Sequence, residues 1–154
     1  MTEKQYLSKE KYKELGEELN FLKTKKRKDL ADTLEHAKSL GDLSENAEYQ
    51  EAREEQANTE KRILDLEEIL KNAVMVEKHH SSAVEVGSVV IVKKEGEKEE
   101  KKFQIVGSEE TDTTFGKISN NSPLGASLMN KKKGDIASFK TPRGEVKYKI
   151  INIE

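Results

Sequence analysis

The chain contains no cysteine and no tryptophan, and only two prolines among its 154 residues. The absence of cysteine excludes disulfides, thiolate metal sites and cysteine nucleophiles. No apolar run approaches the roughly 18 residues that a membrane-spanning helix needs, so we expect no membrane contact. The first residues, MTEKQYLSKEKYKEL, lack the apolar core and cleavage site of a secretion signal. We therefore expect a soluble, cytoplasmic protein.

Hydrophobic residues are also scarce, at 33% of the chain against 38% charged residues. This balance is polar for a single globular core and suits an extended helical element joined to a compact unit. The first 80 residues hold 15 basic and 19 acidic side chains, and the remainder holds 13 and 11. Neither part is the strongly basic body expected of a protein that binds nucleic acid unaided.

Residues 8–40 have the pattern of one amphipathic helix. Ser8 is a suitable N-cap, and apolar residues recur at steps of four and three on both sides of an eight-residue gap. The gap shifts the heptad phase as a stutter rather than a break, and Gly41 follows where a C-terminal glycine belongs. The apolar positions are Leu15, Leu19, Leu22, Leu30, Leu34 and Ala37.

A second helix is predicted over residues 44–75, because small and apolar residues again follow steps of four and three. Two amphipathic helices joined by a short turn pack antiparallel. We therefore predict an antiparallel coiled-coil domain over residues 1–78, a rod of roughly 45 Å with an acidic tip at 41–45. The positions of the second seam are Ala52, Gln56, Thr59, Ile63, Leu66, Leu70 and Ala73.

Residues 79–154 have the composition of a compact α+β domain. It begins with a connector over 79–87 that contains His79 and His80, which lack further partners at zinc-ligand spacing. Ser122 and Pro123 are suited to be the cap and first residue of a short helix. We predict an antiparallel sheet with this helix on one face. The strand segments are 88–94, 102–108, 114–119, 136–140 and 145–153, with a hairpin loop at 93–102 and a tight turn at TPRG.

The stretch GDLSENAEY, residues 41–49, carries Asp42 and Glu45 three residues apart. This spacing matches a capping box, in which Asp42 or Ser44 would cap the second helix. One carboxylate is enough for a cap, however, and two at the end of a narrow rod can enter a channel that excludes a globular body. Mg²⁺ commonly takes one or two carboxylates plus waters and phosphate oxygens. The pair is therefore either a cap or half of a metal site.

Four segments also resemble a known family. They are FLKTKKRKDL, GDLSENAEYQEAREEQ, RILDLEEIL and ISNNSPLGASLMNKKKGDIASFKTPRGEVKYKIINIE. Together they cover essentially the whole chain, and in this order they resemble the bacterial Gre transcript-cleavage factors of the GreA type. The resemblance implies an N-terminal antiparallel coiled coil and a C-terminal FKBP-like domain, in agreement with the predicted layout.

The resemblance further implies a partner, a cofactor and roles for particular residues. Gre factors bind RNA polymerase at its secondary channel and stimulate the polymerase's own cleavage of backtracked RNA, so the factor itself is not an enzyme. Asp42 and Glu45 match the tip carboxylates that help hold the second catalytic Mg²⁺ jointly with the polymerase, without stable binding alone. Ser119, Ser122 and Pro123 match the surface that docks on a coiled coil at the channel rim.

The basic stretch KTKKRK, residues 23–28, has two interpretations. It is either a solvated helix face or a contact to polymerase or to the RNA 3′ end. Lys26, Arg27 and Arg53 are the candidates for a position near RNA. The polar outer faces of the helices make a monomer the expected state.

Three alternatives stay open. A Gre-like relative could bind the same channel and inhibit transcription without cleavage, although the retained acidic pair favours cleavage. A peptidyl-prolyl isomerase would need an aromatic-lined pocket, and the chain after residue 80 has few aromatic residues for one. A plain coiled-coil adaptor would not depend on its tip acids. The aromatic residues after position 80 are Phe103, Phe115, Phe139 and Tyr148.

Overall fold

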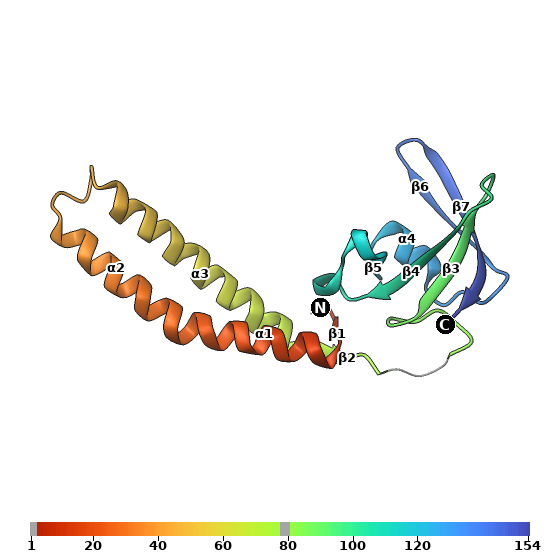
Figure 1. Ribbon diagram of the computed structural model, residues 1–154, viewed down its shortest axis with the longest axis horizontal. Helices are drawn as coiled ribbons and strands as arrows, with labels where there is room; N and C mark the ends of the chain where they lie inside the picture. Colours follow the sequence, from red (N-terminus) through yellow and green to blue (C-terminus); the bar gives the residue numbers. More distant parts are fainter. Residues whose placement is uncertain (1–2, 78–80) are drawn as a thin grey trace. The chain divides into compact units, whose positions relative to one another are not determined.

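The structure is a computed structural model that describes residues 3–77 and 81–154 (Figure 1). It divides into a helical unit, Glu10–Asn72, and a sheet unit made of residues 3–9 and the described residues from Ala73 onward. The division lies earlier in the chain than the predicted boundary between residues 78 and 79. That predicted boundary, together with His79 and His80 of the predicted connector, lies outside the described residues.

One arm of the helical unit is helical from Lys9 to Ser39, close to the predicted 8–40. It comprises α1 (Lys9–Phe21), a π-helix (Leu22–Lys26) and α2 (Arg27–Ser39). The π-helix falls within the eight-residue gap between the two apolar groups. Its wider turn takes up the phase shift that the gap creates, so the helix continues through the stutter.

The second arm, α3 (Ala47–Lys71), runs antiparallel beside the first (Figure 1). Its buried residues Ala52, Thr59, Ile63 and Leu66 follow the predicted seam. The predicted limits of 44 and 75 were wrong at both ends. Asn46 caps the helix, and the last three predicted residues instead form strand β2 (Ala73–Met75).

Strand β1 (Gln5–Leu7) explains why the N-terminal residues group with the sheet unit. It pairs in parallel with β2, and Tyr6 lies opposite Val74. This pairing hydrogen-bonds the backbone of both segments, so residues 73–75 extend as a strand instead of continuing the helix. Local periodicity carries no information about such a distant partner.

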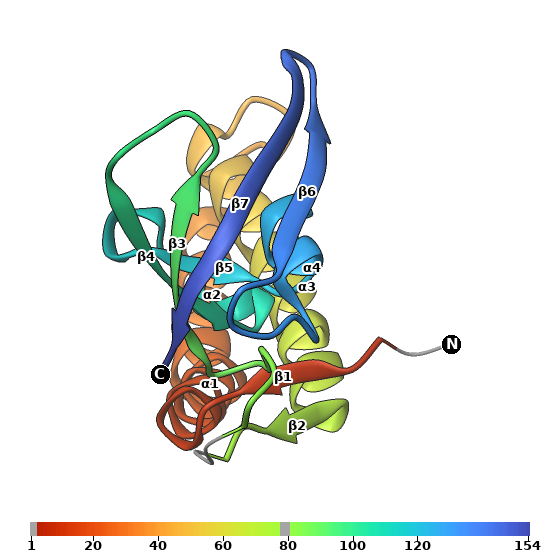
Figure 2. The ribbon, with the colours of Figure 1, turned by 90° about the vertical axis from the view of Figure 1, so that its right-hand side faces the viewer.

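The larger sheet has five strands in the order β5-β4-β3-β7-β6 (Figure 2). Neighbouring strands are antiparallel except for β4 and β5, so the predicted antiparallel sheet was wrong for this one pair. The predicted strand segments all contain strands. The predicted loop at 93–102 was too long at both ends, because only residues 95–99 join β3 to β4. The bounds are β3 Val89–Lys94, β4 Glu100–Val106, β5 Lys117–Ser119, β6 Ile136–Thr141 and β7 Gly144–Ile153, with short 3-10 turns at Ser108–Glu110 and Thr113–Phe115.

The predicted short helix is α4 (Pro123–Leu128). Leu128 lies in the hydrophobic core that forms on one face of the sheet, so α4 covers that face as predicted. The other core residues are Val84, Val90, Val92, Ile105, Ala137, Tyr148 and Ile150. Across the described residues, no helix is both long and apolar enough to cross a membrane.

Candidate functional site

The tip loop, residues 40–46, joins α2 to α3 at the end of the helical hairpin (Figure 1). The backbone leaves α2 at Leu40, whose N–H donates to the Ala37 carbonyl at 3.2 Å. Gly41 then takes a φ of 132°, which side chains larger than hydrogen rarely allow. Residues 41–45 are all exposed. The loop therefore presents its side chains to solvent.

Asp42 is fixed by its neighbour Ser44. The backbone N–H and the hydroxyl of Ser44 both donate to Oδ1 of Asp42, at 3.0 and 2.9 Å. The backbone bond and then the hydroxyl bond stabilise the ionised form, and they lower the pKa of Asp42 below its usual value. Within the described residues, Oδ2 of Asp42 accepts no hydrogen bond.

The cap of α3 is Asn46, whose Oδ1 accepts from the Tyr49 N–H at 3.0 Å. The interpretation that Asp42 or Ser44 caps the second helix is therefore wrong. Glu45 is exposed and makes no hydrogen bond or ion pair with any described residue. The two carboxylates thus lie in one short exposed loop without a capping role.

The donor set of the tip suits a hard cation, because carboxylate oxygens are the ligands that Mg²⁺ and Ca²⁺ prefer. Asp42 and Glu45 supply only part of the six oxygens of an octahedral ion. Over residues 3–77 and 81–154, no group of three or more His, Cys, Asp or Glu is placed to hold a metal. The pair is chemically fit to complete a metal site whose other ligands come from a partner.

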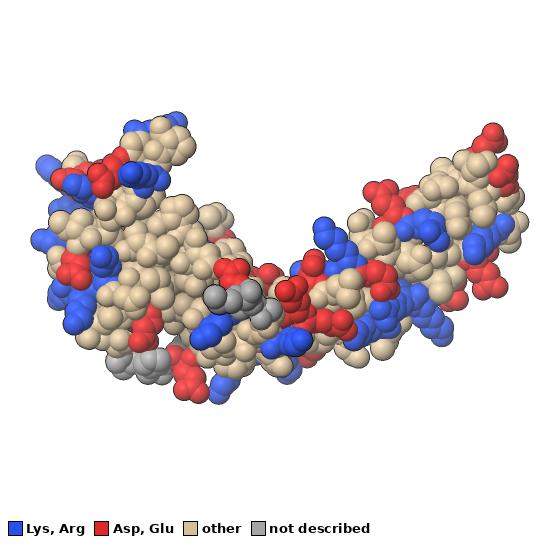
Figure 3. All heavy atoms as spheres, turned by 180° about the vertical axis from the view of Figure 1, so that it is seen from behind, with Lys and Arg blue, Asp and Glu red and all other residues tan. Residues whose placement is uncertain are grey.

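Of the three basic candidates, two are paired within the hairpin. Lys26 forms an ion pair with Glu55, and Arg27 forms a two-pronged pair with Glu60. Arg53 is exposed and has no ion pair among the described residues. On the side that Figure 3 shows, basic and acidic side chains are intermixed along the arm.

The pairing of Arg27 has an electrostatic consequence. The hydrogen bonds to Glu60 raise the pKa of the Arg27 guanidinium, and the same bonds lower the pKa of Glu60. A similar pair joins Arg62 to Glu18, at 2.8 and 3.1 Å. Most of the charge on this part of the arm is therefore balanced between the two helices.

The three predicted docking residues come together where β5 ends and α4 begins. Ser122 donates its hydroxyl hydrogen to the Ser119 carbonyl at 2.7 Å and accepts from the Gly125 N–H at 3.1 Å. Pro123 follows as the first helical residue and is exposed. A Cβ at Gly125 would lie 1.9 Å from the Ser119 carbonyl oxygen, so only glycine fits beneath this turn.

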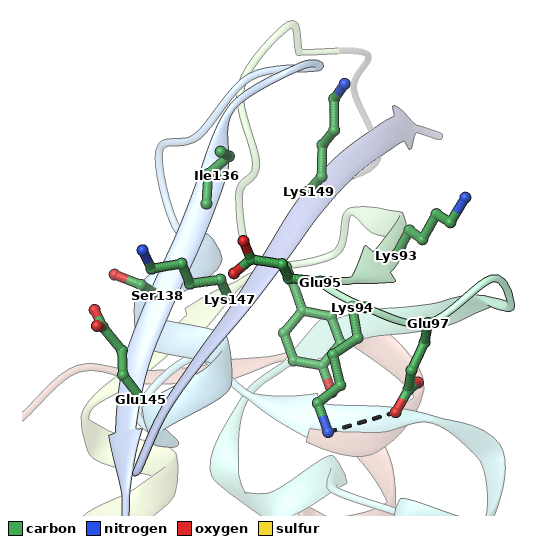
Figure 4. Close-up of a pocket in the computed structure, with 11 residues that line it drawn as sticks. Lys93, Lys94, Glu95, Glu97, Ile136, Ser138, Glu145, Lys147 and Lys149 are labelled. Carbon is green, nitrogen blue, oxygen red and sulfur yellow. Dashed lines mark ion pairs between the residues drawn. The ribbon is translucent and has the colours of Figure 1, made fainter.

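A groove of about 530 Å³ lies on the sheet unit between the β3–β4 loop and strands β6 and β7 (Figure 4). Lys93, Lys147 and Lys149 line it, and so do Lys94 and Glu97, which form an ion pair at 3.5 Å. Tyr148 is its only aromatic lining residue. Such a lining does not resemble the aromatic pocket that a prolyl isomerase needs.

Two sequence families match the chain. One, described as the N-terminal part of a transcription elongation factor, matches residues 5–75. The other, the C-terminal part of GreA and GreB, matches residues 78–154. The chain belongs to the GreA/GreB family of transcription elongation factors. The family predicted from the sequence resemblance is thus confirmed.

Individual Gre relatives match over nearly the whole chain. Transcription elongation factor GreA of Clostridium perfringens strain 13 is 46% identical over 156 residues, which covers 99% of each chain. GreA of Clostridium botulinum strain Hall is 49% identical over 143 residues, which covers 92% of this chain and 89% of that protein. The solved structure of GreA factor homolog 1 of Thermus thermophilus has 28% identity, covers 99% of both chains and gives a TM-score of 0.45.

In this Gre-family chain, sequence reasoning identified the acidic pair but missed what holds the loop. The Asn46 side chain also donates to the Ala37 carbonyl at 2.6 Å, and Gln50 donates to the Leu43 carbonyl at 3.1 Å. The only available signal was the residue type, because asparagine is among the preferred N-cap residues.

Proposed function

We propose that this transcription elongation factor acts on RNA polymerase as an accessory factor, not as an enzyme, and stimulates the polymerase's own cleavage of backtracked nascent RNA. The observation that carries the proposal is the pair of exposed carboxylates, Asp42 and Glu45, at the end of a helical hairpin. Neither carboxylate caps α3. Family membership supports the partner, since the matching families are transcription elongation factors.

The two units have different tasks in this proposal. The hairpin, an antiparallel coiled coil, enters the secondary channel of the polymerase and places its tip near the catalytic centre. The sheet unit, an FKBP-like domain, docks on a coiled coil at the channel rim through the turn that contains Ser119, Ser122 and Pro123. The exposed ring of Pro123 and the ordered turn around it offer a rigid contact surface.

Asp42 and Glu45 act as ligands of a second Mg²⁺ that they hold jointly with the polymerase. When bound, this ion supplies Lewis-acid stabilisation and water activation for phosphodiester hydrolysis. Ser44 supports the role of Asp42 because its two hydrogen bonds fix Oδ1 of the carboxylate in place. Two carboxylates alone are a weak site, so the factor retains no metal outside the complex.

The RNA 3′ end lies near the arm when the factor is bound. Of the three candidates, Arg53 is best suited to approach its phosphates, because Arg53 has no ion pair among the described residues. Lys26 and Arg27 would first have to leave Glu55 and Glu60. The factor works as a monomer in the cytoplasm, where its polymerase is found.

A cleavage assay with a matched control tests the proposal. Backtracked polymerase complexes with labelled RNA receive the wild type, the double variant Asp42→Asn/Glu45→Gln, or the control Glu51→Gln/Glu54→Gln. The control removes two exposed carboxylates with the same three-residue spacing from α3. We expect the tip variant to bind polymerase as the wild type does and to lose cleavage stimulation, while the control keeps it.

Two results would contradict the proposal. If the tip variant still stimulates cleavage, the carboxylates do not act as proposed. If the wild type binds polymerase and produces no cleavage, the chain is a channel-binding relative that modulates transcription in another way.

A further inference from the structure

One side chain joins the ends of both helices at the tip. Asn46 accepts from the Tyr49 N–H with Oδ1 at 3.0 Å, which caps α3. Its Nδ2 donates to the carbonyl of Ala37 in the last turn of α2 at 2.6 Å. The loop that carries Asp42 and Glu45 leaves α2 just after Ala37 and enters α3 at Asn46. The Asn46 side chain therefore closes this loop.

Asparagine suits this position because its side chain both accepts the Tyr49 N–H and donates to the Ala37 carbonyl. Ser and Asp cap a helix about as well as Asn, so the cap by itself does not require an amide. An ionised Asp, by contrast, has no hydrogen to donate to the Ala37 carbonyl, and the hydroxyl of Ser is on a shorter side chain. The orientation of the amide is defined by its partners, because Tyr49 offers a donor and Ala37 an acceptor.

A second contact holds the middle of the same loop. Gln50 lies one helical turn beyond Asn46 on α3, and its Nε2 donates to the Leu43 carbonyl at 3.1 Å. Leu43 lies between Asp42 and Glu45 in the sequence. The backbone between the two carboxylates is thus tied to the same helix face as the end of the loop.

We propose that Asn46 is a positioning residue that holds Asp42 and Glu45 in the arrangement needed to share one cation with the polymerase. The inference rests on the proposed function and adds to it a residue that touches neither cation nor RNA. Two ligands on a short exposed loop must be ordered before they bind one ion together. A contact that orders the loop in advance removes this cost from binding.

The test compares Asn46→Ser with the control Asn58→Ser. The first variant keeps an oxygen that can cap α3 and removes the amide that reaches Ala37. Asn58 is exposed on the same helix and has no part in the loop contacts. Each protein is assayed in the full polymerase complex for maximal cleavage rate, for half-saturating factor concentration and for half-saturating Mg²⁺ concentration. Gln50→Ala provides a second, independent loosening of the loop.

We expect Asn46→Ser to lower the maximal cleavage rate at limiting Mg²⁺ about tenfold. This loss is equivalent to a rise of about 1.4 kcal/mol in the transition-state barrier. Its half-saturating factor concentration stays that of the wild type, and raised Mg²⁺ restores most of the rate. Gln50→Ala shifts the Mg²⁺ requirement in the same direction, and Asn58→Ser does not. A general loss of helix structure would weaken polymerase binding and would not respond to Mg²⁺.

The inference is overturned if Asn46→Ser cleaves as well as the wild type at every Mg²⁺ concentration. It is equally overturned if the loss accompanies weaker polymerase binding and persists at high Mg²⁺. Cleavage that survives in Asp42→Asn/Glu45→Gln would instead overturn the proposed function itself, so the two failures are distinguishable.

Discussion

Arg27 and Glu60 face each other across the two arms of the helical hairpin, with Nε and Nη2 of Arg27 each 2.8 Å from a carboxylate oxygen of Glu60. Lys23 and Lys26 of the same basic stretch also pair with acidic residues of α3. The basic stretch therefore serves largely as an internal counter-charge between the arms. This explains how a run of cations fits within an arm that carries more acidic than basic side chains.

The substitution Glu60→Gln tests this pairing. Because Arg27 lowers the pKa of folded Glu60, the pair stabilises the hairpin above the unfolded-state pKa of Glu60. That stabilisation is lost as the pH falls through the lowered folded-state pKa. Both side chains are nearly half exposed, so we expect a small decrease in melting temperature at neutral pH that shrinks with added salt.

Thermal unfolding of wild type and Glu60→Gln, from neutral to acidic pH at low and high salt, measures the effect. The two proteins should converge at the acidic end, where Glu60 is protonated and resembles glutamine. A difference that does not change with pH or with salt would show that the ion pair contributes nothing.

Ser44→Ala should remove one of the two hydrogen bonds that Asp42 accepts. The variant removes the hydroxyl donor but leaves the backbone N–H, so the pKa of Asp42 should rise part of the way toward its ordinary value. Carboxyl NMR titration of Asp42 measures this directly. Ser39→Ala is the control, because the Ser39 hydroxyl donates to the His36 carbonyl and not to Asp42. An unchanged Asp42 titration in Ser44→Ala would contradict the loop geometry.

Two glycine substitutions should have opposite effects. A Cβ at Gly125 would meet the Ser119 carbonyl oxygen at 1.9 Å, so Gly125→Ala should destabilise the sheet unit by about 1–3 kcal/mol, the usual cost of overpacking. Gly16 lies inside α1, and a Cβ added there would meet no atom within 4 Å. Gly16→Ala should therefore stabilise the helical unit by about 0.5–1 kcal/mol.

Hydrogen exchange in urea, read separately for amides of the two units, checks both glycine predictions. Under the proposed docking role of Ser119 and Ser122, Gly125→Ala should also weaken polymerase binding, since both residues lie in the displaced turn. A Gly125→Ala protein with wild-type protection in the sheet unit would mean that the turn can move aside without cost.

The spacing of apolar residues along the sequence was sufficient to predict most of the fold. The heptad steps predicted both helical arms because buried residues must recur on one face, and the eight-residue gap indicated the phase shift that the π-helix takes up. The pattern failed at Ala73, which continues the heptad step but pairs with Gln5 in a strand. No local signal reports a partner that distant in the sequence.

The two carboxylates of the site could be predicted from the sequence, but the residues that hold their loop in place could not. Asp42 and Glu45 stood out as two acids at a helix break, yet the same spacing matched a capping box. The true cap, Asn46, became evident only with its contacts to Tyr49 and Ala37. Likewise, the pairing of Arg27 with Glu60 depends on the packing of one arm on the other, which charge counting along the sequence does not reveal.

We propose that the tip carboxylates of this Gre-family chain help to hold a Mg²⁺ ion in the polymerase. The most direct test is the Mg²⁺ dependence of RNA cleavage in backtracked complexes with no factor, with wild type and with Asp42→Asn/Glu45→Gln. We predict that the wild type lowers the half-saturating Mg²⁺ concentration and that the double variant leaves it at the value of polymerase alone. Equal half-saturating concentrations for wild type and double variant would contradict the account.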